Sequence, residues 1–447
     1  MSQPAVTTQP ESKRVRNFNE VSLGFSRRVV QEESQRCLQC SDPVCETGCP
    51  LGVKIKEFIR FLREGHAALA YEKIREDNGF PSICGRLCHA PCESRCILIK
   101  EKAPIAIRAL ERYAADFGKS RVARPAMTGK MAVKAAVIGA GPAGLSAAYA
   151  LAKQGMAATV FDAGDRPGGV LRYGVPDFRL PRKVLDGDIA EILAAGVELK
   201  MNCLVGRTVS VEDLLKSKFS AVLFATGAGV PKFMDVKGAN IPGVYYGEEF
   251  LFRANLTKTN IFNRHVPTFP LGKKIAVIGS GNTALDCARA AIRFGLEVHL
   301  IFRRSEEEMR VRTAERVYGK EEGVKMQALT RPVEIIPGKN GLVSGIKCVR
   351  VNNIGDKMIV LPKSEWTLAV DNVVIAVGHQ PNSHAAQSCP AIKINPDGSI
   401  WVDAATGMTT MKGVFACGNA VTNAGPVAQA IAAGKTAAEN ILSALQL

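Results

Sequence analysis

Eight cysteines stand in two dense groups near the start of the 447-residue chain. The groups consist of Cys37, Cys40, Cys45 and Cys49, and of Cys84, Cys88, Cys92 and Cys96. Thiolates spaced two to four residues apart in a loop can bind one inorganic centre together, and a proline after the last of them, here Pro50, is typical of ferredoxin-like sequences. The pattern therefore predicts iron–sulfur clusters.

Zinc is the main alternative, because Cys37-x-x-Cys40 is also a zinc-binding spacing. Two dinucleotide-binding fingerprints, described below, favour iron over zinc, because dinucleotide cofactors carry electrons and iron–sulfur clusters transfer them. A disulfide framework is disfavoured, since the opening MSQPAVTTQPESKR is polar and lacks the charged and apolar regions of a secretion signal. We expect a cytoplasmic protein with free thiolates.

The first fingerprint is Gly139-x-Gly141-x-x-Gly144, which directly follows the apolar segment AAVI. In such a motif the glycines allow a tight turn, close approach of a pyrophosphate and close packing of helix on strand, with the phosphates at the helix N-terminus. The next apolar segment, AATVFD, ends at Asp162, where a carboxylate can bind ribose hydroxyls. These features predict a dinucleotide site.

FAD is the expected ligand of this first site. The segment RPGGVLRYGVPDFRLP follows Asp162 and contains Gly168 and Gly169, which we include among the cofactor-binding residues. Near the C-terminus, Gly418 and Asn419 begin a segment that can place a second helix N-terminus near the flavin.

The second fingerprint is Gly279-x-Gly281-x-x-Ala284, and Asn282 within it is included among the expected cofactor-binding residues. The following strand, EVHLIFRR, ends in Arg303 and Arg304 where an NAD site would have an acidic residue. Two guanidinium groups there can bind a ribose 2′-phosphate, which favours NADP over NAD. The alternative is a solvated arginine pair. No Cys-x-x-Cys lies within either module, so electrons are expected to leave through the clusters.

The order of these motifs predicts an α/β protein with three units. We expect a helical cluster domain at residues 1–125, an FAD-binding domain at 126–265 and 370–447, and an NADP(H)-binding domain at 266–369 inserted into it. The C-terminal segment GVFACGNAVTNAGPVAQAIAAGKTAAENI is the part that returns to the first module. SRVARPAMTGK, residues 120–130, is expected to be a linker.

The net charge of +16 raises the possibility of nucleic-acid binding, but the 58 basic residues are scattered and no such motif occurs. An acidic protein partner and a simply solvated basic surface remain open. The longest uncharged run, residues 135–152, contains three glycines and a proline and is typical of a buried strand and turn, so no membrane span is predicted.

Several segments together resemble the glutamate synthase small-subunit family of NAD(P)H-dependent flavoproteins. The resemblance runs from about Asn17 to Ile441, and it rests on RCLQCSDPVCETGCPLGVKIKEFI, CGRLCHAPCESRC, PIAIRALERYAADFG, GGVLRYGVPDFRLP, IGSGNTALDCAR and FRRSEEEM. The family also includes the large subunit of NADH-dependent ferredoxin:NADP oxidoreductase and the flavin half of dihydropyrimidine dehydrogenase.

The resemblance implies two [4Fe-4S] clusters with interleaved ligands. It assigns one cluster to Cys37, Cys40, Cys45 and Cys96, and the other to Cys49, Cys88 and Cys92. A non-cysteine fourth ligand of the second cluster matches Glu111, which leaves Cys84 as a spare. Periodicity alone does not select Glu111, since a glutamate on a solvated helix face is the simpler interpretation.

Two departures from the family pattern stand out. Asn419 occupies a position that is usually aspartate, so its contact to the flavin lacks charge. Arg310, in EEEMR, replaces a residue that is often proline. The isolated Cys203, Cys287, Cys348, Cys389 and Cys417 are expected to be small buried side chains, and Asp286 a packing or helix-surface residue.

The resemblance implies an NADPH-oxidising subunit that passes electrons through FAD and two clusters to a larger catalytic or electron-accepting subunit. A glutamate synthase complex is the first expectation. The chain alone is not expected to make glutamate, because no glutaminase module fits within it, so a larger subunit would complete the complex. The alternatives are another acceptor, in a transhydrogenase, a pyrimidine-reducing enzyme, or a hydrogenase or formate dehydrogenase assembly, and a non-catalytic cluster carrier. We predict no acid–base residue, since the six histidines show no triad or metal spacing.

Overall fold

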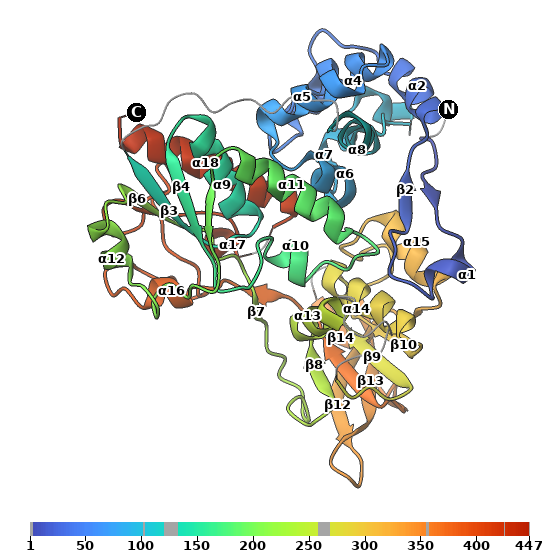
Figure 1. The fold of residues 1–447 in the computed structure, drawn as a ribbon. Coiled ribbons are helices and arrows are strands. Elements are labelled where there is room, and N and C mark those ends of the chain that lie inside the picture. The colour runs from blue at the N-terminus through green and yellow to red at the C-terminus, as the bar shows by residue number, and fades with distance from the viewer. Residues whose placement is uncertain are drawn as a thin grey trace.

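The computed structural model describes residues 3–101, 103–119, 133–257, 269–354, 357–423 and 425–446. Within these ranges the chain forms a helical unit near the N-terminus and two units built on parallel sheets, as Figure 1 shows. The predicted linker at 120–130 lies outside the described residues, as does the boundary predicted at residues 265 and 266.

The helical unit contains the eight clustered cysteines. Its two longest described helices are α5 (Ala67–Asp77) and α8 (Ile107–Gly118), and α5 and α6 (Pro81–Leu87) both pack against α8. The apolar side chains of α4 (Ile55–Arg63) and α8 recur on one helix face and are buried, in a core that continues into the first of the two sheet units. The remaining elements are β1 (Thr7–Thr8), α1 (Glu11–Arg14), β2 (Ser22–Gly24), α2 (Arg27–Gln35), α3 (Val44–Thr47), α7 (Pro91–Ser94) and the 3-10 helix η1 (Ile97–Glu101).

The first parallel sheet has the strand order β18-β6-β3-β4-β5, so its edge strand comes from the C-terminal segment. The C-terminal helix α18 packs along α9, the helix of the first fingerprint. This confirms that the second module is inserted into the first. The elements are β3 (Lys134–Ile138), α9 (Pro142–Lys153), β4 (Ala157–Phe161), α10 (Val170–Tyr173), α11 (Arg182–Ala194), β5 (Glu198–Lys200), α12 (Val211–Lys216), β6 (Ala221–Phe224), α16 (His384–Gln387), β18 (Val414–Ala416), α17 (Asn419–Thr422) and α18 (Val427–Ala444).

The second parallel sheet has the order β11-β10-β9-β16-β8, and an antiparallel sheet of β12, β13, β14 and β15 accompanies it. The sequence motifs did not predict this antiparallel sheet. The elements are β8 (Val244–Tyr246), α13 (Gly247–Thr257), β9 (Lys274–Ile278), α14 (Asn282–Arg293), β10 (Glu297–Ile301), α15 (Thr313–Glu321), β11 (Lys325–Gln327), β12 (Thr330–Pro337), β13 (Val343–Ile354), β14 (Lys357–Val360), β15 (Trp366–Leu368) and β16 (Asn372–Ile375).

Strand pairing shifts the predicted limits of the second unit. Strands β8 and β16 lie outside the predicted range 266–369, yet both belong to the second sheet because β16 pairs with β8 and with β9. The chain passes between the two units through β7 (Val230–Pro231) and β17 (His379–Gln380), which pair with each other as an antiparallel two-stranded sheet.

The N-terminal segment ties the helical unit to the second module. The buried Arg14 side chain forms ion pairs with Glu321, at 2.5 Å, and with Glu322, at 3.3 Å. Phe18 and Val21 are buried in the core of the second module, whereas Glu20 pairs with Arg86 of the helical unit at 2.8 Å. The helical unit is thereby held against the dinucleotide-binding units.

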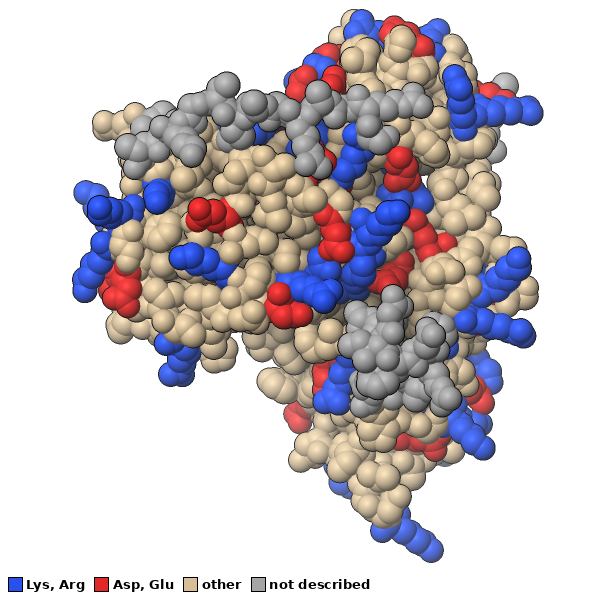
Figure 2. All heavy atoms as spheres, viewed as in Figure 1, with Lys and Arg blue, Asp and Glu red and all other residues tan. Residues whose placement is uncertain are grey.

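Charged side chains of both signs are dispersed over the face drawn in Figure 2, which matches the scattered basic residues of the sequence. None of the helices in the described part of the chain is long and apolar enough to cross a membrane.

Candidate functional site

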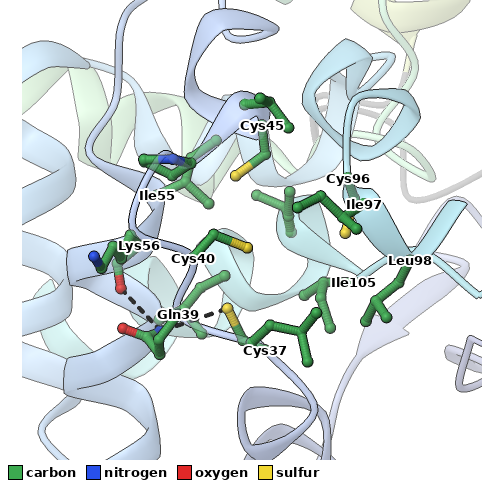
Figure 3. A pocket seen from close by; sticks show the side chains of 15 residues that line it. Cys37, Gln39, Cys40, Cys45, Ile55, Lys56, Cys96, Ile97, Leu98 and Ile105 are labelled. Atoms are coloured by element: carbon green, nitrogen blue, oxygen red, sulfur yellow. Dashed lines mark hydrogen bonds between the residues drawn. The ribbon is translucent and has the colours of Figure 1, made fainter.

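Four of the clustered cysteines surround one pocket in the helical unit, which we call the outer pocket. They are Cys37, Cys40, Cys45 and Cys96, and Figure 3 shows their side chains around a common space. The remaining lining is mostly apolar and includes Ile55, Ile97 and Ile105. The structure thus brings Cys96 from the second sequence group to three cysteines of the first.

The loop between Cys37 and Cys40 has a fixed shape. Gln39 adopts a left-handed backbone conformation with φ of 53°, which few residues other than glycine and asparagine favour. Its Nε2 atom donates to the Cys37 sulfur at 3.4 Å and to the Lys56 carbonyl at 3.2 Å. Gln39 therefore holds this loop against α4 and supplies a donor to one sulfur.

The other four clustered cysteines line a second pocket, the inner pocket. Cys49, Cys84, Cys88 and Cys92 are joined there by Glu111 from α8. Ile55 and Ile107 line both pockets, so the two spaces lie on opposite sides of these side chains. Ala428, near the start of α18, also lines the inner pocket, which therefore borders the first dinucleotide-binding unit.

Both pockets suit thiolate-bound clusters better than a single ion. Within the described ranges, no three His, Cys, Asp or Glu side chains are arranged to hold one metal ion. A [4Fe-4S] cluster makes a different demand, because each of its four irons takes its own ligand and the four ligands stay apart around the cluster. Four thiols around an apolar space fit that demand.

Free thiols in these pockets resist ionisation. Burial raises the pKa of Cys45 to about 12 and that of Cys88 to about 11. Burial likewise raises the pKa of Cys37 and of Cys49, where Glu111 adds its negative charge. A bound cation must displace these protons, so cluster assembly and proton release are coupled.

Glu111 does not lie on a solvated helix face. Its side chain is half-buried in the inner pocket, and Asn78 Nδ2 donates to its Oε1 at 2.8 Å. Burial raises the pKa of Glu111 to about 8, although the Asn78 hydrogen bond and the Arg108 charge oppose the rise. Cys84, the expected spare, is 2% exposed and lines the same pocket.

The first glycine turn has the geometry that its sequence predicts. Gly139 has φ of 114°, and a Cβ atom there would overlap the carbonyl oxygen of Ala225, which directly follows the neighbouring strand β6. At Gly144 a Cβ would overlap the Gly139 carbonyl oxygen. Helix α9 begins directly after Gly141, so its free N–H groups face the space before the turn.

Asp162 stands at the end of β4 beside this turn. Its two carboxylate oxygens accept from the backbone N–H groups of Ala140, at 2.6 Å, and Gly164, at 2.7 Å. Asp162 and Gly139 line a cleft of about 800 Å³, which suits the adenosine part of a dinucleotide. The aspartate therefore stabilises the turn as well as facing the cleft.

The remaining residues predicted for FAD lie around the same turn. The Gly168 N–H donates to the Ala140 carbonyl at 2.8 Å, and Gly169 lies against Gly141. Gly418 precedes the short helix α17, with its Cα close to the side chain of Ala143. The Asn419 amide is directed back to the Gly425 carbonyl at 3.5 Å. The structure thus brings these residues together at the start of α9.

The second glycine turn repeats this arrangement. Helix α14 begins at Asn282, directly after Gly281, and Ala284 is fully buried beneath Gly279. Asn282 Nδ2 lies 3.4 Å from His89 Nε2 of the helical unit, and no described residue gives a partner to its buried Oδ1. His89 directly follows Cys88, so the second turn touches the cluster-binding unit.

The arginine pair lies where β10 ends. Arg303 is exposed and Arg304 is half-buried, and among the described residues neither guanidinium has a carboxylate partner. The chain then returns to the glycine turn, because the Arg310 N–H donates to the Ser280 carbonyl at 3.1 Å. Uncompensated positive charge therefore stands at the edge of the second dinucleotide site.

The structure also places the isolated cysteines and Asp286. Four of the isolated cysteines are buried, but Cys203 is half-buried and lines the cleft beside Asp162, which corrects its predicted burial. Asp286 is 3% exposed and pairs with Arg179 at 2.6 Å, so it is a buried partner of an ion pair.

Comparison with known proteins identifies the family. Residues 133–437 match the model of the pyridine nucleotide-disulphide oxidoreductases, and residues 14–122 match that of dihydropyrimidine dehydrogenase domain II with its 4Fe-4S cluster. The glutamate synthase [NADPH] small chain of Azospirillum brasilense is 33% identical over 97% of this chain and 92% of its own length. The chain belongs to the glutamate synthase small-subunit family.

Further relatives show the range of this family. The Escherichia coli glutamate synthase small chain is 32% identical over 96% of this chain and 94% of its own length. The NADP(+)-dependent formate dehydrogenase subunit beta of Moorella thermoacetica is 36% identical over 89% of this chain, which spans only 59% of that longer protein. Mycobacterium tuberculosis FprA in complex with NADPH shares the fold, with 18% identity, a TM-score of 0.58 and coverage of 70% of this chain and 84% of that one.

Membership of the family establishes the class of chemistry. The protein is an oxidoreductase that uses FAD, NADP(H) and 4Fe-4S clusters for electron transfer. Three polar residues at these sites escaped the sequence analysis, namely Gln39, Asn78 and Arg108. Gln39 and Arg108 lie within segments that carry the family resemblance, and Asn78 lies outside them, but the residue type of none of the three predicts its role.

Proposed function

We propose that the chain is the electron-input subunit of a glutamate synthase-type complex, taking electrons from NADPH and passing them through FAD and two [4Fe-4S] clusters. The observation that carries the proposal is the continuity of the sites. The inner pocket borders α18 of the FAD-binding unit through Ala428 and shares Ile55 and Ile107 with the outer pocket. A flavin in the FAD-binding unit, a cluster in the inner pocket and a cluster in the outer pocket would therefore lie next to one another in that order.

The residues have distinct roles in this proposal. The turn at Gly139 and Gly141 holds the FAD pyrophosphate at the start of α9, and the turn at Gly279 and Gly281 does the same for NADPH at α14. Arg303 and Arg304 bind the 2′-phosphate. When bound, the flavin accepts a hydride from NADPH and the clusters carry its electrons singly.

The proposed ligands of the outer cluster are Cys37, Cys40, Cys45 and Cys96, which line the outer pocket. Those of the inner cluster are Cys49, Cys88, Cys92 and Glu111, which line the inner pocket. Carboxylate ligation departs from the usual four cysteines, and the position of Glu111 in the pocket supports it. A cytoplasmic location is part of the proposal, since thiolate ligands persist in a reducing compartment.

The outer pocket is the proposed exit for electrons. Leu38 and Ile97 line it and are 59% and 46% exposed, whereas Cys84 and Cys92 at the inner pocket are buried. A larger partner subunit would cover these two side chains, since apolar surface at the centre of an interface is what association buries. The net charge of +16 favours an acidic partner.

A second candidate is the same electron transfer to a formate dehydrogenase. The specific support is the 36% identity to the beta subunit of the NADP(+)-dependent enzyme of Moorella thermoacetica. In that assignment the cofactor sites and the exit are unchanged, and only the partner differs.

The test is anaerobic purification of the native complex, with identification of the co-eluting chain by mass. We expect a large subunit and glutamine-dependent glutamate formation with NADPH. NADPH-driven dye reduction with a formate-oxidising partner would support the second candidate. Absence of dye reduction by protein with bound FAD would contradict both.

A further inference from the structure

Two side chains compete for the fourth ligand position of the inner cluster. The inner pocket contains Cys49, Cys88 and Cys92, and both Glu111 and Cys84 face the same space. Close packing of two helices brings the competitors together. A Cβ atom added at Gly85 of α6 would lie only 2.5 Å from the Cα of Arg112 in α8, and Cys84 and Glu111 are the residues just before these two.

A buried amide, Asn78, contacts one of the two competitors. Its side chain is fully buried where α5 ends, and its Nδ2 donates to Glu111 Oε1 at 2.8 Å. Asn78 therefore fixes one carboxylate oxygen of Glu111 at the inner pocket.

The orientation of the Asn78 amide is fixed. Its Oδ1 accepts from the Phe80 N–H at 2.8 Å, so the NH₂ group must face the pocket side. Burial strengthens this constraint, since a rotated amide would set Oδ1 against a carboxylate oxygen and leave a buried backbone N–H without a partner. Asn78 can consequently offer Glu111 only a donor.

The contacts of Glu111 leave one of its oxygens available. Among the described residues the structure gives its side chain a single hydrogen bond, the one from Asn78 to Oε1. Arg108, one turn earlier on α8, lines the pocket as well and supplies positive charge close to the carboxylate. Oε1 is thus engaged while Oε2 remains for a metal.

We propose that Asn78 is the positioning residue that presents the Glu111 carboxylate, in place of the Cys84 thiol, as the fourth ligand of the inner cluster. The proposal rests on the inner-cluster assignment of the proposed function. It makes Asn78 the residue that selects an oxygen ligand over a fourth sulfur, and thereby a determinant of the potential of the inner cluster.

The decisive variant is Asn78→Asp. Aspartate has the shape of asparagine and can still accept from the Phe80 N–H, but it has no donor for Glu111 and adds a second carboxylate beside it. The full chain is purified anaerobically, and three properties are measured: iron per chain, the EPR spectrum after reduction, and the reduction potential of each cluster. A fully loaded chain holds about eight irons.

We expect N78D to lose or shift the inner-cluster signal, with iron falling toward about four per chain where the cluster is lost. C84A is expected to match the wild type in iron, spectrum and potential. The double variant N78D with E111Q is expected to restore the inner cluster, since a glutamine amide in place of Glu111 donates to the introduced aspartate and keeps its own oxygen for iron. C40A identifies the outer-cluster signal.

Two results would overturn the proposal: an unchanged inner-cluster spectrum and potential in N78D, or loss of that cluster in C84A. The proposed function fails separately, because C88A that retains about eight irons would show that the cluster is not held in this pocket. FAD content and far-UV circular dichroism establish that each variant is folded.

Discussion

The Arg179 guanidinium of the FAD-binding unit donates to the Asp286 carboxylate of helix α14, with Nη1 and Oδ2 2.6 Å apart. Both side chains are nearly excluded from solvent, at 8% and 5% exposure. Arg179 also lies 3.7 Å from Glu315 of α15. This ion pair joins the two dinucleotide-binding units in addition to their connecting strands β7 and β17.

Removal of one partner of this pair should destabilise the protein. Asp286→Ala leaves the buried Arg179 without its main counter-charge, which typically costs about 3–5 kcal/mol. We expect a lower urea midpoint in unfolding followed by the fluorescence of Trp366 and Trp401, which belong to the two units. The matched control is Glu32→Gln, which breaks the exposed Arg28–Glu32 pair and should shift the midpoint far less, because solvent screens that pair. Equal midpoints for the two variants would contradict the role of the buried pair.

Close packing of α18 on α9 predicts a severe effect of a single methyl group. A Cβ atom at Gly434 would overlap the Ala143 carbonyl oxygen near the start of the FAD-binding helix. Gly434→Ala is therefore expected to lower FAD content and thermal stability. In the matched control, Gly187→Ala in helix α11, the new methyl meets only the Lys119 Nζ that pairs with Asp188, and no backbone atom, so this variant should keep its normal flavin content. Normal flavin content in G434A would refute the predicted clash.

Arg303 and Arg304 should determine coenzyme preference. Because neither guanidinium has a carboxylate partner in the described part of the chain, both are available to a 2′-phosphate. Arg303→Gln with Arg304→Gln is expected to lower kcat/KM for NADPH by about 100-fold, the equivalent of two charge-assisted hydrogen bonds, while that for NADH changes little. Lys339→Gln removes a charge from the exposed loop between β12 and β13 and should leave both values unchanged. Equal losses with both coenzymes would mean that the arginines serve another purpose.

The pKa of Glu315 predicts a pH-dependent contribution to stability. Burial favours its protonated form, but Arg179, Arg289 and Arg312 outweigh burial and lower the pKa to about 2. A lowered pKa stabilises the fold above the unfolded value of 4.5, and this contribution is lost as pH falls from there toward 2. Glu315→Gln should therefore be less stable than the wild type at pH 7, by a margin that narrows below pH 4.5. Thermal unfolding across this range measures the margin, and a constant margin would contradict the ionic role.

Local motifs made much of the fold predictable, whereas the ligand sets depend on tertiary structure. The glycine turns and their strands follow from short segments in which Gly139 and Gly279 have backbone angles that other residues avoid. Spacing alone groups Cys49 with Cys37, yet the structure places Cys49 with Cys88 and Cys96 with Cys37. The helices between the two sequence groups bring their loops together, and no local pattern encodes that arrangement.

The ion pairs of Arg14 were missed for a similar reason, because Arg14 meets Glu321 from far along the chain. The antiparallel sheet β12–β15 was missed for a different reason: its strands follow one another closely, but they belong to no dinucleotide-binding motif. Asn78 and Gln39 are isolated polar residues whose roles depend on the cysteines that fold beside them. Such contacts become visible only in the folded chain.

The exposed side chains at the outer pocket predict where a partner binds. Leu38 and Ile97 are 59% and 46% exposed and line the pocket that contains Cys37 and Cys96. A carboxylate at either position would be buried without a partner on docking, so Leu38→Glu and Ile97→Asp should each weaken the complex about tenfold or more. NADPH-driven dye reduction and iron content should stay normal, because neither side chain binds a cofactor in the proposal. Leu342→Asp, at a 46% exposed position in the β12–β13 loop, is the matched control and should bind the partner normally. Wild-type affinity in both outer-pocket variants, measured by co-purification and titration with the partner subunit, would place the electron exit elsewhere on the surface.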